Sequence, residues 1–481
     1  MSELDEILRR ARDESPQIVE VLCRKYLARQ PGDPRAWTLL FNSVLAQNNF
    51  QEVRLLVRTM TERMPADDSA RALAVYALAR SGFTAEAYRE SLAIEARSVE
   101  SNPAFRNVVA CLERLHAGRS PRTFGGTPST RIAGEIEEFN RGQSSAGGGG
   151  VDVVCFLKQD WHMSIQRGIA DALRAAGARV YIADTLWFAL AAEPKVLVVS
   201  EALYGDTFHV RARLPGCRIV NTRHGLGDKN HAALGASQSD FICVSSDAFA
   251  GLLEHETLVN REKLWVTGFP QMDSLFRGAA GRSAQRDAPE KTVLFAPTFN
   301  PGLSAGFLLA DDLVSSIRGT DDDIRIIVRP HPLFTRGNPG IIEKWSREAL
   351  VHRNVVLDLD PGSNLMDLFA QCDVMISDVS SAALAWFAVG RPLICVIDRA
   401  KAALSGHYSP DGLEWKMQEA AVLVDRPGPL HPAVVGALED PGRQASERDR
   451  FRTFLFGDCT DGFASDRVAA RVLDLLKEAD R

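Results

Sequence analysis

The chain has 481 residues, too many for one hydrophobic core, and this length predicts about three domains. Apolar residues make up 45% of the sequence and charged residues 25%, which is typical of a soluble globular protein. The formal net charge of −6 at pH 7 gives no overall attraction to nucleic acid, so nucleic acid is not an expected partner. No apolar run is long enough to predict a transmembrane segment.

The first ten residues, MSELDEILRR, are charged and amphipathic, whereas a secretory signal has a continuous apolar stretch. We therefore expect the protein in the cytoplasm, with a peripheral position at the inner face of the membrane as the alternative. The eight cysteines are scattered and form no C-x-x-C pair. This pattern predicts buried free thiols, without disulfides or structural zinc.

Residues 1–118 are predicted to be helical, because apolar residues recur at helical spacing and β-branched runs are nearly absent. Pro31 and Pro65 lie 34 positions apart, as do Glu52 and Glu86. This period resembles that of tetratricopeptide repeats, which stack helix pairs and present a groove to a protein or peptide. An ordinary helical bundle is the alternative.

Residues 119–150 are rich in Gly, Ser, Pro and Thr and end in four glycines, which predicts a flexible linker with one short helix near Ile132 to Asn140. From Val151 onward, short buried strands alternate with helices, which predicts parallel sheets covered on both faces. Two doubly wound domains in succession describe an α/β architecture of GT-B type. We expect an acceptor-side lobe at 151–280 and a nucleotide-donor lobe at 281–481.

Polar loops that follow strands are the candidate site, because ligands of such sheets bind beyond the carboxyl ends of the strands. Four of these loops stand out: NTRHGLGDK at 221–229, FAPTFN at 295–300, RPHP at 329–332 and SDVSS at 377–381. The last loop joins the buried strand VMIS to an apolar helix. Ser380 and Ser381 are therefore predicted to hold phosphate at the start of that helix.

The order of these motifs along the chain resembles that of the CDP-glycerol glycerophosphotransferases, the GT-B enzymes that build teichoic-acid and related capsule polymers. The resemblance covers about residues 215–475. The family's His-Gly-Thr-Pro-Leu-Lys loop is matched by His224, Gly225 and Lys229, and its Gly-Tyr-Pro-Arg-Asn-Asp by Gly268 and Asp273.

The remaining motifs lie in the second predicted lobe. Tyr-Ala-Pro-Thr-Trp-Arg is matched at Thr298, Arg-x-His-Pro at Arg329 and His331, Thr-Asp-x-Ser-Ser at Asp378, Ser380 and Ser381, and Asp-Gly-x-x-Ser-x-Arg at Asp461. Two arginines of these motifs are replaced, by Gln271 and Asn300. An arginine can bind two phosphate oxygens through two parallel N–H donors, so these replacements affect which phosphate-bearing group can be transferred.

The resemblance implies an enzyme that moves a glycerol-phosphate-like group from a CDP-activated donor to a hydroxyl of a cell-surface glycan, without a cofactor. Deprotonating that hydroxyl requires a base, and histidine suits this role at neutral pH. His224 is the predicted base and His331 the second catalytic residue. Donor-binding residues are expected at Thr298, Arg329, Asp378, Ser380 and Ser381. Acceptor-side or supporting residues are expected at Gly225, Lys229, Gly268, Asp273 and Asp461.

Two other functions remain open. One is a CMP-sugar glycosyltransferase for sialic acid, another nonulosonate or Kdo, acting on a glycan, lipid-linked or protein acceptor. The other is an adaptor whose helical residues 1–118 bind a protein partner while the transferase lobes are degenerate. No metal site is predicted: Asp321 to Asp323 is expected to be a solvated turn, and His162, His231 and His255 lack metal-ligand spacing.

Overall fold

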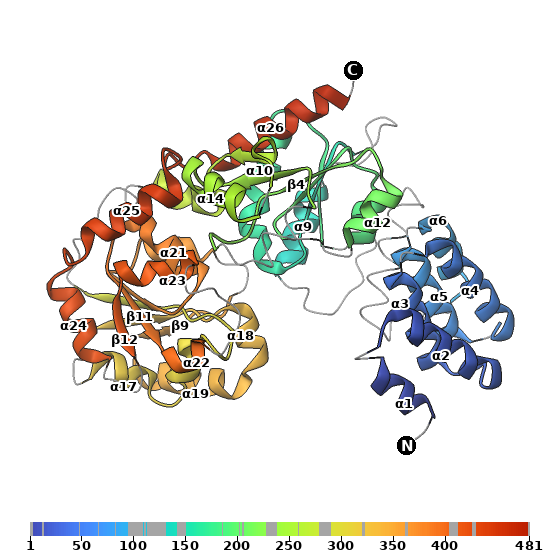
Figure 1. Cartoon of the computed structure of the whole chain (residues 1–481), viewed down its shortest axis with the longest axis horizontal. Helices are drawn as coiled ribbons and strands as arrows, with labels where there is room; N and C mark the ends of the chain where they lie inside the picture. Colours follow the sequence, from blue (N-terminus) through green and yellow to red (C-terminus); the bar gives the residue numbers. More distant parts are fainter. Residues whose placement is uncertain are drawn as a thin grey trace. The chain divides into compact units, whose positions relative to one another are not determined.

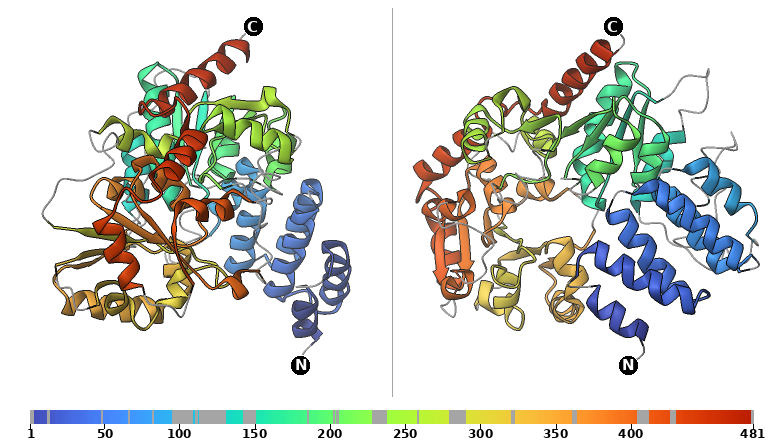
Figure 2. Two further views of the ribbon diagram at one scale, coloured as in Figure 1. Left: turned by 60° about the vertical axis from the view of Figure 1, so that its left-hand side comes forward. Right: turned by 45° about the vertical axis from the view of Figure 1, so that its right-hand side comes forward.

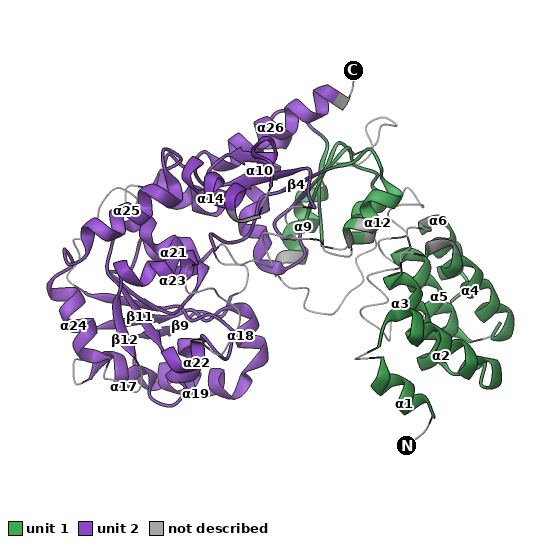
Figure 3. Cartoon of the chain, viewed as in Figure 1, with its two compact units in different colours: residues 1–156, 179–197, 203–218 green, residues 157–178, 198–202, 219–481 purple. Residues whose placement is uncertain are grey.

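The computed structural model describes most of the chain (Figure 1). The described residues are 3–11, 14–47, 49–65, 67–81, 83–94, 109, 112, 131–141, 151–184, 186–201, 203, 206–227, 238–257, 259–278, 290–319, 323–360, 364–403, 412–425 and 430–479. They form two compact units (Figure 3). The first unit comprises residues 1–156, 179–197 and 203–218, and the second comprises residues 157–178, 198–202 and 219–481.

The first unit begins with six helices in the described residues: α1 (Glu3–Arg10), α2 (Pro16–Arg29), α3 (Pro34–Ala46), α4 (Phe50–Arg63), α5 (Asp68–Arg80) and α6 (Thr84–Ser91). Each packs against the next, as the blue segments of Figure 2 show. The starts of α3 and α5 are 34 residues apart, and so are those of α4 and α6. The predicted helical character is confirmed over α1 to α6, whereas most of residues 95–118 lies outside the described residues. The tetratricopeptide assignment stays a prediction.

Side-chain contacts in these helices recur with the same spacing. The indole Nε1 of Trp37 donates a hydrogen bond to the carbonyl of Pro31 at 2.8 Å. At the positions 34 residues later, the guanidinium of Arg71 donates to the carbonyl of Pro65 at 2.7 Å. In both α3 and α5, a side chain in the first turn of the helix therefore hydrogen-bonds to the carbonyl of a proline in the preceding turn.

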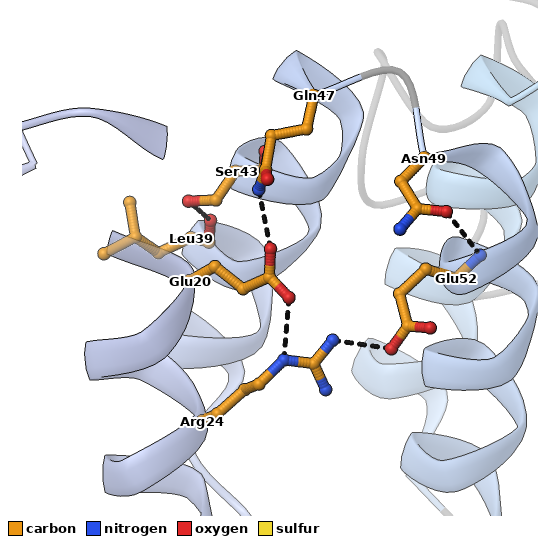
Figure 4. A network of polar contacts seen from close by, with 7 residues as sticks. All are labelled: Glu20, Arg24, Leu39, Ser43, Gln47, Asn49 and Glu52. Atoms are coloured by element: carbon orange, nitrogen blue, oxygen red, sulfur yellow. Dashed lines mark hydrogen bonds and ion pairs between the residues drawn. The ribbon is translucent and has the colours of Figure 1, made fainter. Parts of the chain in front are cut away.

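Ion pairs also link alternate helices, although only their glutamates, and not their arginines, follow the 34-residue spacing. Arg24 of α2 donates to Glu20 at 2.8 Å and to Glu52 of α4 at 2.5 Å (Figure 4). Arg54 of α4 in turn pairs with Glu86 of α6 at 2.6 Å. Exposed pairs of this kind contribute only about 0–1 kcal/mol each, so their effect is mainly on how alternate helices align.

Two six-stranded sheets follow, with strand orders β2-β1-β3-β4-β5-β6 and β12-β11-β10-β7-β8-β9. The first contains β1 (Val153–Phe156), β2 (Val180–Ala183), β3 (Val196–Val199), β4 (Arg218–Asn221), β5 (Phe241–Val244) and β6 (Leu264–Val266). The second contains β7 (Thr292–Phe295), β8 (Arg325–Val328), β9 (Val355–Leu357), β10 (Val374–Ser377), β11 (Leu393–Ile397) and β12 (Val422–Asp425).

The helices between these strands are α9 (Arg131–Arg141), α10 (Met163–Ala175), α11 (Leu186–Ala191), α12 (Asp206–Arg213), α14 (Asp247–Thr257), α15 (Asp273–Arg277), α16 (Ala305–Leu308), α17 (Leu313–Arg318), α18 (Pro332–Gly337), α19 (Pro339–Val351), α20 (Leu365–Phe369), α21 (Ser381–Trp386), α22 (Arg399–Ala403), α23 (Leu413–Lys416), α24 (His431–Glu439), α25 (Ala445–Phe456) and α26 (Ala464–Ala479). Short 3-10 turns include η1 (Asp160–His162) and η3 (Pro270–Met272). The helix expected near Ile132 to Asn140 is confirmed as α9.

The sequence predicts ten of these twelve strands and misses β6 and β12. Each lies at an edge of its sheet and has a neighbour on one side only. The residues of β12, VLVD, are mostly not buried, and β6 is only three residues long. β6 is therefore too short, and β12 too exposed, to show the long buried apolar run of a central parallel strand.

The second sheet is covered on both faces, as its apolar strands predict. Met375 of β10 packs in a cluster with residues of α14, α21 and α25. Its neighbours Val374 and Ile376 point to the opposite face and pack with α17, α19 and α24. Because side chains alternate along a strand, an unbroken apolar run buries both faces at once.

Helix α26 is attached to the loop after β6 through a buried carboxylate. Asp273 accepts hydrogen bonds from the backbone N–H of Ala464 at 2.8 Å and of Ser465 at 2.9 Å. Burial raises the pKa of Asp273 above its ordinary value, and these donors oppose the rise. Gly268 has φ +86°, and a Cβ there would lie 3.0 Å from the Cβ of Ala464. The close approach therefore requires glycine.

The segment before α26 is fixed by a second carboxylate. Asp461 accepts a hydrogen bond from the N–H of Phe463 at 3.1 Å and pairs with Arg467 of α26. Arg467 also donates to the carbonyl of Thr267 at 3.4 Å. The two motifs at Gly268 to Asp273 and Asp461 to Arg467 thus form one structural attachment.

The expected burial of the cysteines is met in the described residues. The seven cysteines located there are all free thiols, and six of them are buried. Burial raises the pKa of Cys243 to about 12. Among the described helices, none is both long and apolar enough to cross a lipid bilayer.

We expect the Asp273→Ala variant to lose about 1–3 kcal/mol of unfolding free energy, because two buried N–H groups at the start of α26 lose their acceptor. Urea denaturation followed by circular dichroism measures this loss. Asp474→Ala is the matched control, since Asp474 lies on the same helix and is 62% exposed. Equal stability of the two variants would contradict the anchoring role of Asp273.

Candidate functional site

A pocket in the second unit collects most of the predicted site residues. Its lining includes residues that follow β4, β7, β8 and β10, at the carboxyl ends of these parallel strands. Seven of the predicted residues line it: His224, Gly225, Thr298, Arg329, His331, Ser380 and Ser381. Loops separated by up to about 160 positions in the sequence thus meet in one place, as the fold class predicts.

The loop that carries His224 begins with an unusual backbone conformation. Arg223 has φ +58°, a left-handed conformation that side chains other than glycine rarely adopt. Its N–H donates to Asn221 Oδ1 at 2.9 Å, and its guanidinium donates to the carbonyl of Gly227. The guanidinium also lies 5.2 Å from the ring centre of Phe249. These contacts hold the turn that directs His224 to the pocket.

The protonation of His224 follows from its neighbour. Its Nδ1 lies 3.1 Å from the carbonyl oxygen of Ser200. Because a carbonyl can only accept, Nδ1 carries the proton in the neutral ring and Nε2 keeps a lone pair. The hydroxyl of Ser200 is itself fixed by Gln166 at 2.8 Å and Thr222 at 2.9 Å. His224 is thereby oriented as a proton acceptor.

His331 has the opposite arrangement. Its Nδ1 accepts a hydrogen bond from the N–H of Leu333 at 3.1 Å and so caps α18. The neutral ring must therefore carry its proton on Nε2, which is a donor. The ring lies between Trp161 and Phe299, with centroid distances of 5.5 and 4.9 Å. The pocket thus contains one histidine whose Nε2 can accept a hydrogen bond and one whose Nε2 can donate one.

The two serines contribute differently. Ser380 caps α21, with its Oγ accepting from the N–H of Ala383 at 3.3 Å and lying 3.1 Å from the Oγ of Ser377. Ser381 faces the His224 loop. A Cβ built at Gly225 would lie 3.0 Å from the Ser381 Oγ, so only glycine fits without displacement.

The second glycine of that loop is more tightly confined. A Cβ at Gly227 would lie 1.9 Å from Oε1 of Glu414, the fully buried second residue of α23. It would also lie 3.0 Å from the Ser381 Oγ. The loop between His224 and Gly227 therefore approaches the second sheet's loops through its backbone.

Arg329 is buried beside the pocket with a carboxylate partner. Its Nη1 lies 2.9 Å from Oδ1 of Asp358 and 2.5 Å from the carbonyl oxygen of Asp360. Only 7% of the arginine side chain is exposed. The ion pair reduces its net charge and holds the loop after β9 against the pocket wall.

Other predicted site residues lie outside the pocket lining. Asp378 is fully buried, and its carboxylate accepts from the N–H groups of Thr298 and Ala305, each at 2.9 Å. It therefore positions the Thr298 loop. Gly268, Asp273 and Asp461 belong to the attachment of α26. Lys229 lies outside the described residues, as do His231, Asp321 and Asp322.

Several lining residues were not predicted from the sequence, among them Trp161, Phe269, Gln271 and Phe299. Three of them lie within or beside recognised motifs, at positions that carry no charge. Trp161 follows β1, so the rule that ligands bind after strands could have identified it. The one histidine of its loop, His162, has no metal-ligand spacing to other histidines in the sequence.

The structure places His162 beside His224, with ring centroids 5.6 Å apart. His162 is fully buried, and burial lowers its pKa to about 3, with the nearby His224 and Lys158 adding to the shift. Its Nε2 lies 3.6 Å from Oε2 of Glu201, which follows β3. Glu201 was not singled out from the sequence either.

Comparisons with known proteins agree with this geometry. The chain is 23% identical over 252 residues to the teichoic acid glycerol-phosphate transferase of Staphylococcus aureus (strain NCTC 8325 / PS 47). This match covers 48% of the present chain and 60% of the relative, so the chain spans about three fifths of that protein's length.

Among solved structures, the wall teichoic acid polymerase TagF is similar in fold. A variant soaked with CDPG for 15 minutes superposes with a TM-score of 0.51 at 13% identity, covering 73% of this chain and 95% of that one. The 30 minute soak gives a TM-score of 0.50 at 15% identity, with the same coverage. The predicted α/β fold of GT-B type is confirmed.

The sequence model for CDP-Glycerol:Poly(glycerophosphate) glycerophosphotransferase matches residues 215–474, which contain every residue found in the pocket except Trp161. This match spans more than half of the chain and includes both histidines and both serines. The chain therefore belongs to the CDP-Glycerol:Poly(glycerophosphate) glycerophosphotransferase family.

Proposed function

We propose that this protein transfers a glycerol-phosphate-like group from a CDP-linked donor to a hydroxyl of a glycan acceptor. Family membership supports the class of reaction. The observation that carries the proposal is the pair of histidines in one pocket, His224 with Nε2 as acceptor and His331 with Nε2 as donor. Transfer to a hydroxyl requires one group of each kind.

The proposed step is a displacement at the phosphorus that carries the polyol. The acceptor oxygen forms a bond to this phosphorus while its proton passes to Nε2 of His224. The phosphoanhydride bond to CMP breaks, and its electron pair stays on the CMP phosphate. His331 donates a hydrogen bond from Nε2 to the oxygen on which charge develops, where such a donor contributes most.

The hydroxyls of Thr298, Ser380 and Ser381 are proposed to bind the remaining phosphate oxygens. Ser380 and Thr298 are buried, so hydrogen bonds from them to phosphate would meet little competition from water. Arg329 adds positive charge, part of which Asp358 offsets.

The identity of the polyol is proposed to depend on two uncharged positions. Gln271 lines the pocket, and its side-chain nitrogen donates to Ser164 at 3.0 Å. The Oδ1 of Asn300 accepts from the N–H of Gly302 at 2.8 Å. Neither amide brings the charged fork of an arginine, so a second phosphate on donor or acceptor would be bound less strongly here.

The assay uses purified full chain with CDP-glycerol and a panel of glycan acceptors. Release of CMP with a glycerol-phosphate mass increment on the acceptor is expected. A CMP-sialic acid or CMP-Kdo donor tests the alternative, for which CMP release would accompany a sugar-sized increment. Absence of turnover and of binding with all cytidine donors would overturn both.

Residues 1–118 are proposed to recruit a protein partner or the acceptor, and the reaction is proposed to occur in the cytoplasm or at the inner face of the membrane. The repeated helix pairs support the first part, since stacked pairs present an extended surface. Capture of the same partner by the full chain and by a chain lacking residues 1–118 would contradict it.

For His224→Gln we expect kcat to fall by about 10²–10⁴-fold, because the acceptor hydroxyl loses its base. The donor KM should change little. Steady-state kinetics with CMP release as the readout tests this. His255→Gln is the control, since His255 is exposed on α14. A kcat within twofold of the control would remove His224 from the mechanism.

His331→Asn separates two roles of this residue. Asparagine is a good N-cap, so the unfolding free energy should change by less than about 1 kcal/mol. The Nε2–H is lost, and kcat/KM should fall by roughly 10–100-fold, as expected for a hydrogen bond to a charged group. Unchanged kcat/KM in a stably folded variant would rule out the phosphate contact.

Gly227→Ala should abolish most transfer, because the new methyl group would displace either Glu414 or the His224 loop. Gly251→Ala is the control, since a Cβ there has nothing within 4 Å. Comparison of kcat/KM with the donor for the two variants, alongside their melting temperatures, provides the measurement. Full activity of Gly227→Ala would show that the close approach is not needed.

A further inference from the structure

A buried histidine beside the pocket has no role in the proposed reaction. His162 is fully buried, and neither of its ring nitrogens has a hydrogen-bond partner among the described residues. Leaving a buried polar group unpaired is unfavourable, so such groups usually meet a protein partner, a water molecule or an ion.

Glu201 lies at a distance that suits a shared ion better than a direct hydrogen bond. Its Oε2 is 3.6 Å from Nε2 of His162. Hydrogen bonds of this type are at most about 3.2 Å long. Two ligands on a tetrahedral zinc ion, each about 2.0 Å from the metal, are separated by roughly 3.3 Å. A movement of a few tenths of an ångström would bring these two atoms to that separation.

His224 completes a group of three. One ligand atom each of His162, Glu201 and His224 lies within 4.8 Å of the other two. The three residues come from the ends of neighbouring strands β1, β3 and β4, so they rest on one edge of the sheet. We propose that His162, Glu201 and His224 form a binding site for one divalent transition-metal ion, of the class represented by Zn²⁺.

The ligand set decides which ions suit the site. Two imidazoles and one carboxylate match Zn²⁺, Co²⁺ or Ni²⁺, whereas Mg²⁺ and Ca²⁺ prefer oxygen ligands. Three protein ligands leave a fourth position open. Lys158, whose Nζ is 3.6 Å from Glu201, is the charged neighbour that opposes binding and keeps the affinity moderate.

An ion in this site would engage the proposed base. Since His224 also lines the pocket, metal binding and proton transfer through this residue compete. Transition-metal ions should therefore inhibit the transfer reaction. This consequence, unlike the site itself, rests on the proposed function.

The binding test uses untagged full-length protein and Co²⁺, whose visible absorption reports nitrogen and oxygen ligands, with Zn²⁺ displacement as a second reading. One Co²⁺ per chain is expected. His162→Leu and Glu201→Gln should each weaken binding by more than about 10-fold. Among the described residues, His162 makes no hydrogen bond that leucine would break, and Glu201 is 24% exposed, so at least one variant should fold. His255→Gln is the matched control and should bind like the unaltered protein.

Absence of one-site Co²⁺ binding, or binding that persists in both variants, would overturn the proposal. The activity test compares each protein with and without Zn²⁺, and the unaltered protein should be inhibited at least 10-fold more strongly than Glu201→Gln. If the protein binds Co²⁺ at this site but lacks transferase activity, the proposed function fails and the metal site stands.

Discussion

The site depends on one buried carboxylate. Asp378 has no solvent exposure, and it accepts hydrogen bonds from the N–H groups of Thr298 and Ala305, which lie 80 and 73 positions away in the sequence. A buried charge of this kind is costly unless its lone pairs are satisfied, so the loop after β7 has to close over it. Closure brings Thr298 to the pocket. The neighbouring Ser380 is held in place by its own cap of α21.

The chemistry is determined by backbone groups as much as by side chains. A carbonyl at Ser200 fixes the proton of His224, and the N–H of Leu333 fixes that of His331. Two histidines in the same pocket therefore differ in the hydrogen-bonding capacity of Nε2, which accepts in one ring and donates in the other. Neither assignment needs a charged partner, because each follows from the hydrogen-bonding capacity of one peptide group.

Much of this could be predicted from the sequence, and the exceptions have physical causes. Central strands such as β10 are recognisable because both of their faces are buried, which requires an unbroken apolar run. The edge strand β12 is mostly not buried, so its sequence is not restricted in this way. Motif order indicated His224 and His331, which both line the pocket, while their catalytic roles stay a prediction. It could not distinguish Asp378, which supports the loop, from Ser381, which lines the pocket. His162 and His224 are 62 positions apart, and only the pairing order of the strands reveals that they are neighbours.

The attachment of α26 has a consequence for how the protein folds. The contact between Asp273 and Ser465 joins positions 192 residues apart. Closing so long a loop is entropically unfavourable until the intervening sheet has formed, so this contact should be made late. During synthesis, helix α10, against which α26 packs, must wait for the whole second sheet before α26 covers it. Its apolar surface is therefore exposed to chaperones and to aggregation for longer than that of the second sheet.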